Sequence, residues 1–152
     1  MGLMLEKTMS KEGKVIKVCK CEKRGMLKKT QDKINIITNY GVEGDYHAGR
    51  SHRQVSLLGI ESLEKIVKER DINLKDGYCN FAQNITIKGI ELYKYPVGTK
   101  FRVGESVLLE ITEIGKAGEF NPDNIMLTEG IFAKVLEGGI VVPGDELTIV
   151  SE

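Results

Sequence analysis

Apolar and polar residues alternate in several short segments of this chain, and β-branched side chains are frequent in them. A period of two is typical of a β-strand that buries one face. β-Branched side chains also pack well on such a pleated surface. The pattern predicts strands at residues 14–20, 33–38, 54–58, 84–88, 100–103, 106–114 and 146–150.

Two segments have helical spacing instead. Residues 60–67 place apolar side chains on one face and charged ones on the other, which predicts an amphipathic helix of about three turns. A second helix is expected after Thr128, a possible N-cap, with Gly138-Gly139 at its end. The apolar stripe of this second helix would consist of Ile131, Phe132, Val135 and Leu136.

Turn residues separate the predicted strands. Gly104-Glu105 joins two of them with glycine first, as a type II′ hairpin turn prefers. Pro143-Gly144-Asp145 precedes the last strand and predicts another turn.

Many short strands with only two convincing helices indicate a mainly β domain. A doubly wound sheet would need a regular β-α-β alternation, which is missing. A closed or nearly closed barrel would pair the strand edges that otherwise stay open. The chain has 152 residues, the size of one domain. We expect an N-terminal tail over residues 1–12 and a single β-barrel domain over residues 13–152.

The charges of the chain balance, with 22 Lys and Arg against 22 Asp and Glu. A general nucleic-acid binder normally has a basic excess, so the balance argues against one while leaving room for a local basic pocket. The Lys- and Arg-rich residues 20–33 are therefore interpreted as a solvated loop rather than an RNA site.

The cysteine count and the apolar runs indicate where the protein works. Three cysteines argue against a disulfide framework, which a domain of this size does not need. The N-terminus becomes charged after five residues, too soon for a signal peptide. No apolar run approaches the roughly 20 residues of a spanning helix. We expect a soluble protein of the reducing cytoplasm, without a membrane partner.

The richest chemistry lies in residues 41–58, which contain both histidines of the chain, His47 and His52. Arg50 and Arg53 would grip a phosphate or carboxylate there, and the imidazoles would donate further hydrogen bonds. The alternative is an ordinary loop in which Asp45 pairs with one of the arginines and the histidines face solvent. A metal site of Asp45, His47 and His52 is a further alternative, but the spacing matches no zinc pattern, and we predict no metal ligands.

Three other residues are weaker candidates. Asn84, at the start of a predicted strand, offers both a donor and an acceptor to a heterocyclic ligand, or it satisfies a turn. Cys79 would be reactive only if a nearby cation lowered its pKa. Lys116 follows a predicted strand in Gly115-Lys116-Ala117-Gly118, where a lysine could reach a phosphate.

These pieces occur in an order that is more specific than any one of them. They are residues 41–49 (GVEGDYHAG), 53–58 (RQVSLL), 81–86 (FAQNIT), 89–92 (GIEL), 96–99 (PVGT), 115–116 (GK), 129–135 (EGIFAKV) and 143–145 (PGD). Together they resemble the MOSC family, a domain type found at the C-terminus of molybdenum-cofactor sulfurases and in small stand-alone bacterial proteins. The likeness runs from about residue 15 to residue 150.

The resemblance implies a strand-rich, pyruvate kinase barrel-like fold whose pocket binds the molybdenum cofactor, molybdopterin with its phosphate and dithiolene-held molybdenum. Family members are thought to receive, carry or deliver sulfur, so the partners would be molybdenum enzymes or cofactor biosynthesis proteins. The cofactor-binding residues would be His47, Arg50, Arg53, Asn84, Lys116 and Asp45. Of these, Asp45 would hold the shape of the loop.

One position departs from the family pattern. Members typically carry a cysteine shortly after the Gly-Lys pair, proposed to hold persulfide sulfur, whereas this chain has Gly118 there. Glycine cannot act as a nucleophile, so the catalytic residue stays open and Cys79 is the thiol that would substitute. The alternatives are a small reductase or hydrolase acting on another heterocyclic or phosphorylated substrate, and a non-catalytic member acting through protein contacts.

Overall fold

The structure is a computed structural model, and it describes residues 11–23, 29–49, 51–70, 81, 83–115 and 128–151. Its helices are α1 (Ile60–Arg70) and the short 3₁₀ helix η2 (Leu92–Lys94). Its strands are β1 (Glu12–Lys20), β2 (Lys29–Gln31), β3 (Ile34–Ile37), β4 (Gly41–Val42), β5 (Val55–Gly59), β6 (Ile85–Lys88), β7 (Lys100–Val103), β8 (Val107–Ile114), β9 (Ile131–Glu137), β10 (Gly139–Val141) and β11 (Glu146–Ser151). None of the described helices has the length and apolar character needed to cross a bilayer.

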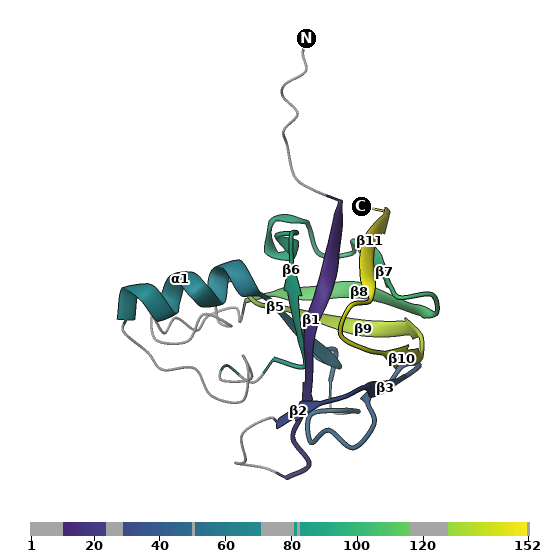
Figure 1. Ribbon diagram of the computed structural model, residues 1–152. Coiled ribbons are helices and arrows are strands. Elements are labelled where there is room, and N and C mark those ends of the chain that lie inside the picture. The colour runs from purple at the N-terminus through teal and green to yellow at the C-terminus, as the bar shows by residue number, and fades with distance from the viewer. Residues whose placement is uncertain are drawn as a thin grey trace.

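Seven of the strands form a closed barrel, in the order β11-β7-β8-β9-β5-β6-β1, with β1 pairing back to β11 (Figure 1). The barrel is mixed, because β5 and β6 run parallel while the other neighbours are antiparallel. β2 extends the sheet beyond β1. The predicted mainly β barrel is therefore confirmed.

Alternating side chains fill the barrel. In β8 the inward-facing residues Val107, Leu109 and Ile111 are completely buried, and the residues between them are only partly covered. β7 contributes Phe101 and Val103 in the same way. Inward and outward positions alternate along every strand of a barrel, so the period-two pattern of the sequence follows from this geometry.

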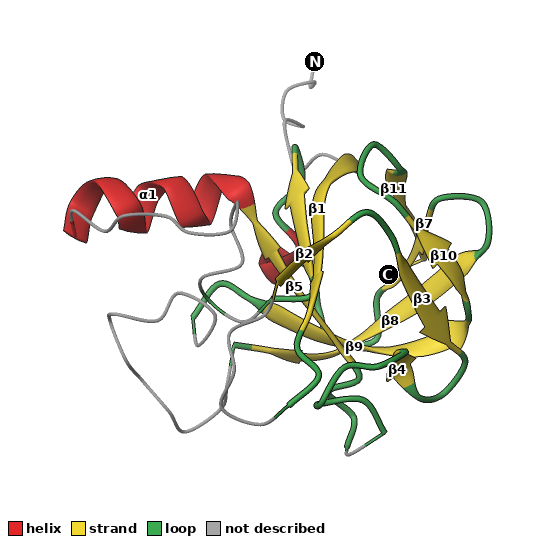
Figure 2. Ribbon diagram, turned by 60° about the horizontal axis from the view of Figure 1, so that its bottom comes forward, coloured by secondary structure: helices red, strands yellow, loops and turns green. Residues whose placement is uncertain are grey.

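A second, three-stranded sheet in the order β10-β3-β4 lies against the barrel (Figure 2). Its buried side chains belong to the same apolar core as those of the barrel. Those side chains are Ile34, Ile36, Val42 and Val141.

Helix α1 connects the parallel strands β5 and β6 and lies outside the barrel wall (Figure 2). Leu63 and Ile66 of the helix pack on Leu58 of β5, and Phe132 of β9 packs against this small core. The predicted helix at residues 60–67 is confirmed.

The predicted helix after Thr128 is wrong, because this segment forms β9. Ile131, Ala133 and Val135 point into the barrel, and the residues between them are half-buried. The spacing of the apolar residues is compatible with the period of a helix and with that of a strand. The segment forms a strand because it pairs with β5 on one side and β8 on the other.

Smaller features also differ from expectation. The β7–β8 hairpin has Val103 opposite Val107, so its loop has three residues rather than the expected two. The pattern did not predict β2, β4 and β10, which are only two or three residues long. Cys19 is buried and disulfide-bonded, which the cysteine count did not lead us to expect, whereas the buried thiol of Cys21 is reduced and donates to the carbonyl of Lys23 at 2.9 Å.

Candidate functional site

The loop after β4 depends on glycines. Gly41, Gly44 and Gly49 all have positive φ, at 130°, 80° and 73°. The amide of Gly49 donates to the carbonyl of Tyr40 at 2.8 Å, which folds the loop back on itself. A Cβ at Gly49 would lie 2.6 Å from the Tyr40 ring, so both its conformation and its surroundings favour glycine.

Asp45 ties this loop to the end of β1. Its carboxylate is buried, and Oδ1 accepts the amide of Cys21 at 2.8 Å. Oδ2 accepts the amide of His47 at 3.3 Å. The amide of Tyr46 in turn donates to the carbonyl of Cys21 at 2.6 Å. These contacts fix the path of the chain through the loop.

Both histidines are accessible. The side chain of His47 is 59% exposed and lies edge-on to the Tyr46 ring, at 5.3 Å between ring centroids. The side chain of His52 is 55% exposed, and its Nε2 lies 2.7 Å from Oε1 of Glu113. Within the described residues, no group of three or more His, Cys, Asp or Glu side chains could hold a metal ion, so Asp45, His47 and His52 do not assemble as a metal site.

Arg53 and His52 meet on one carboxylate. Arg53 makes a two-pronged ion pair with Glu113 of β8, with Nε donating to Oε1 at 2.7 Å and a terminal nitrogen donating to Oε2 at 2.8 Å. The guanidinium also lies over the ring of Phe132, 5.1 Å from its centroid. Thr112 adds a hydrogen bond from its hydroxyl to the carbonyl of His52 at 2.8 Å. We call Arg53, His52 and Glu113 the Arg–Glu–His cluster.

This arrangement holds the guanidinium of Arg53 in one position and leaves the Arg53–Glu113 pair with little net charge. The Arg53–Glu113 pair is bidentate, the strongest geometry for such a pair. The Arg53 side chain is still 31% exposed, so a ligand can reach it. Because the two charges of the pair cancel, the cluster offers an anion hydrogen-bond donors rather than a large net positive charge.

Glu113 was not among the site residues predicted from the sequence, although its position in the strand pattern is unusual. The alternation of β8 would place residue 113 inside the barrel, where an unpaired carboxylate would be costly. The register of β8 against β9 shifts between Ile111 and Glu113, and this irregularity turns the carboxylate outward toward Arg53. A glutamate at an inward position of an alternating strand was therefore the available signal.

Asn84 is more deeply buried than the side chains of the cluster. It is only 2% exposed. Its Oδ1 accepts the amide and the hydroxyl of Ser56, both at 3.1 Å, and its Nδ2 donates to the carbonyl of Cys19 at 3.1 Å. Asn84 therefore joins β1 and β5 just before β6 begins, and its contact with a ligand stays a prediction.

The remaining predicted site residues, Arg50, Lys116, Cys79 and the position of the family cysteine, Gly118, lie outside the described residues. The structure therefore brings together Arg53 and His52 through Glu113, and joins Asp45 to His47.

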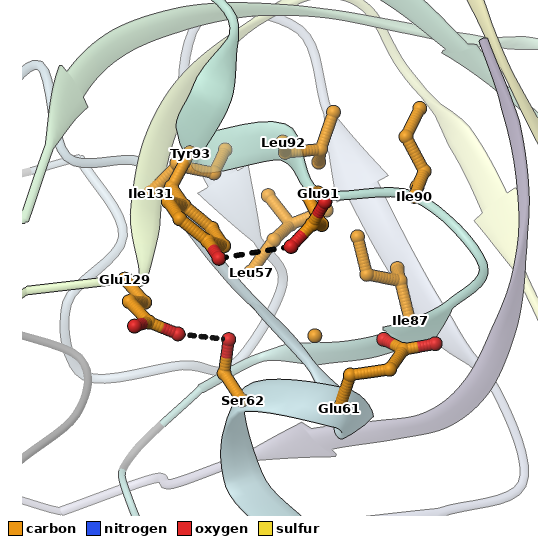
Figure 3. Close-up of a pocket in the computed structure, with 11 residues that line it drawn as sticks. Leu57, Glu61, Ser62, Ile87, Ile90, Glu91, Leu92, Tyr93, Glu129 and Ile131 are labelled. Atoms are coloured by element: carbon orange, nitrogen blue, oxygen red, sulfur yellow. Dashed lines mark hydrogen bonds between the residues drawn. The ribbon is translucent and has the colours of Figure 1, made fainter. Parts of the chain in front are cut away.

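A second polar group surrounds a small cavity at the start of α1 (Figure 3). Ser62 donates to Oε1 of Glu129 at 2.5 Å, Lys65 donates to Oε2 of Glu129 at 2.6 Å, and Tyr93 donates to Glu91 at 3.0 Å. The floor is apolar and consists of Leu57, Ile87, Ile90, Leu92 and Ile131. We call Ser62, Lys65 and Glu129 the helix anchor, because they fix α1 to the segment that leads into β9.

The hydrogen bonds of this region shift its pKa values. Burial alone would raise the pKa of Glu129, but the hydrogen bonds from Lys65 and Ser62 outweigh it and lower the pKa. The hydrogen bond to Glu129 raises the pKa of Lys65. Burial, together with the hydrogen bond to Glu91, raises the pKa of Tyr93 to about 12. The polar groups around the cavity are thus paired with one another, and the region serves to hold the helix in place.

The described residues define a class of protein: a mixed seven-stranded barrel with a crossover helix, and a glycine-rich loop followed in sequence by an Arg–Glu–His cluster. The YUAD protein from Bacillus subtilis has a similar fold, with a TM-score of 0.74 and 17% identity over 93% of this chain and 97% of that chain. YiiM from Escherichia coli is similar with a TM-score of 0.61 and 18% identity, over 91% of this chain and 70% of that chain. YiiM from Geobacillus stearothermophilus is similar with a TM-score of 0.58 and 14% identity, over 94% of this chain and 75% of that chain.

YuaD and YiiM are MOSC-domain proteins. At these identities the likeness shows a shared fold. No family model matches the chain, and no curated protein matches its sequence.

Proposed function

We propose that this chain is a MOSC-type domain that binds the molybdenum cofactor and takes part in carrying or delivering sulfur to molybdenum enzymes. The observation that carries the proposal is the Arg–Glu–His cluster, which follows the glycine-rich loop of residues 41–49 in sequence. The motif resemblance and the fold shared with MOSC-domain barrels support it.

The side chains of the cluster suit a phosphorylated pterin in kind. Glu113 holds the guanidinium of Arg53 from one side and Phe132 covers one of its faces, so little freedom remains to be lost when it meets a phosphate. The imidazoles of His47 and His52 are more than half exposed and can donate hydrogen bonds to polar atoms of a pterin.

These residue types suggest what the cofactor and the chain would each contribute. When bound, the cofactor would supply the molybdenum and its sulfur ligands. The chain would supply charge, hydrogen bonds and orientation, with Asp45 and the loop glycines fixing the position of His47. Because Gly118 stands where the family has its cysteine, the sulfur would come from the cofactor or from a partner protein.

The proposal is tested by adding molybdenum cofactor to the purified protein, removing the excess, and measuring bound molybdenum and the fluorescence of the oxidised pterin. We expect stoichiometric retention by the wild type. Arg53→Ala should weaken retention about tenfold or more, since a charge-assisted hydrogen bond contributes about 1.5–3 kcal/mol. The matched control is Arg102→Ala, which removes an arginine that is also partly exposed, at 34%, and that pairs with Glu137 at 2.9 Å on another part of the barrel.

A double variant separates two causes of a loss. Arg53→Ala also leaves the carboxylate of Glu113 without this partner, and that negative charge would repel an anion. If retention returns in Arg53→Ala/Glu113→Gln, the arginine acts only by neutralising Glu113. A continued loss in the double variant supports direct contact with the cofactor. No retention by the wild type would refute cofactor binding.

A further inference from the structure

Strand β10 lies on the side of the barrel away from α1 (Figures 1 and 2). A broad hollow is lined in part by this strand. It encloses about 760 Å³ and is open to solvent. Its walls are the β7–β8 hairpin loop, strand β10 and the turn that leads into β11. None of its lining residues belongs to the Arg–Glu–His cluster or the helix anchor.

Strand β10 is an edge of its sheet, because within the described residues it pairs only with β3. The direction of its backbone groups follows from the register. The carbonyl of Asn35 accepts the amide of Glu43 at 2.8 Å, so the backbone groups of Asn35 point toward β4. Ile140 lies directly opposite Asn35 on the other side. In an antiparallel pair of this kind, the N–H and C=O of Ile140 point away from β3, toward the open edge.

The side chains along this edge are apolar although they face solvent. Ile140 is 53% exposed and Val142 is 36% exposed. Single exposed apolar residues are common on protein surfaces, but an uncovered strand edge that also carries apolar side chains tends to pair with another chain. Natural proteins usually place a charge or a proline there, and β10 reads Gly-Ile-Val.

The charges around the hollow have one sign. Glu105, Asp145 and Glu146 line it, and among the described residues no lysine or arginine does. Arg102 lies nearby and hydrogen-bonds the carbonyl of Ser106 at 3.3 Å, but its charge is paired with Glu137. Asp145 accepts the amide of Val142 at 2.9 Å within the turn, so Glu105 and Glu146 present the more available charges.

We propose that β10 is a docking edge for an extended segment of a partner protein that alternates Lys or Arg with small apolar residues. Such a segment adds a strand to the sheet and exchanges backbone hydrogen bonds with Ile140. Its apolar side chains cover Ile140 and Val142, and its basic side chains meet Glu105 and Glu146. The acidic rim selects a basic partner by charge complementarity.

The test uses a fluorescein-labelled peptide of alternating Lys and Val, with a Glu–Val peptide of equal length as control, and fluorescence anisotropy as the readout. Saturable binding of the Lys–Val peptide that weakens with salt is expected, with no binding of the Glu–Val peptide. Ile140→Lys should weaken binding tenfold or more. Val150→Lys changes an equally exposed residue, at 55%, on β11 and should weaken it less than twofold.

A second variant, Glu105→Gln, removes a charge of the hollow without changing β10. It should weaken binding of the Lys–Val peptide about threefold. Circular dichroism should show both Ile140→Lys and Glu105→Gln folded like the wild type, since both side chains are exposed. The proposal is overturned if the Lys–Val peptide does not bind, or if Ile140→Lys and Val150→Lys weaken it equally. Sedimentation that shows a dimer lost in Ile140→Lys would instead assign the edge to a second copy of this chain.

Discussion

Replacing Asn84 with alanine tests the role that the structure gives this residue. The side chain is buried and joins two strands through three hydrogen bonds, two from Ser56 and one to Cys19, each at 3.1 Å. Asn84→Ala removes the hydrogen bonds to both strands.

The size of the effect follows from the number of lost bonds. A typical hydrogen bond contributes a net of about 1 kcal/mol, and a buried group that loses its partner costs about 1–3 kcal/mol. For the three bonds of Asn84 we therefore expect a loss of about 3 kcal/mol in the free energy of unfolding. In a domain of this size, 1 kcal/mol corresponds to about 2–4 °C in the melting temperature, so Tm should fall by roughly 6–12 °C.

Thermal unfolding followed by circular dichroism measures this change, and urea unfolding gives the free energy directly. The matched control is Asn35→Ala, which removes an exposed asparagine that donates to Glu43 at 3.1 Å. This control should lower stability by less than about 0.5 kcal/mol. If both variants melt at the same temperature, Asn84 does not hold the strands together and the reasoning from its buried hydrogen bonds is refuted.

Two further predictions concern the helix anchor and the loop. Glu129 has a lowered pKa in the folded protein, so its contribution to stability is present above its ordinary pKa of 4.5 and is lost as pH falls through the lower folded value. Glu129→Gln should therefore be less stable than the wild type at pH 7, and urea unfolding should show the difference shrinking below pH 4.5; a difference independent of pH would contradict the pairing with Lys65 and Ser62. Gly49→Ala should destabilise the protein by about 1 kcal/mol or more, since alanine is disfavoured at φ 73° and its Cβ would meet Tyr40. Unchanged urea unfolding in this variant would show that the loop adopts another path.

The parts of the fold that the sequence predicted are those in which local pattern and tertiary environment agree. β7 has the same limits as predicted, and α1 begins at Ile60 as expected, because each buries one face only. β9 was missed because its apolar residues fit a helical stripe as well as a strand. The choice between them depended on β5 and β8, which flank it in the barrel but lie far from it in sequence.

The candidate site shows the same division. Composition pointed to residues 41–58 as the segment with unusual chemistry, and the positive φ angles of its glycines agree with a loop that needs them. The sequence did not predict that Glu113 pairs with Arg53 and His52. Glu113 lies sixty residues from Arg53 in the chain, and a register shift in β8 determines where its side chain points. The burial of Asn84 could not be predicted from the sequence either, because it depends on β1 and β5 lying next to this residue.

The sequence by itself determined the secondary structure of most strands, the glycine-rich loop and the types of functional group that the loop carries, since these depend on period, turn preference and residue chemistry. The tertiary structure decided how the barrel closes, which carboxylate pairs with Arg53, and that β10 pairs on one side only within the part of the chain that the structure describes. The physical reason is that pairing and burial join residues distant along the chain, and their energies depend on the surroundings that the fold creates rather than on the neighbours in sequence.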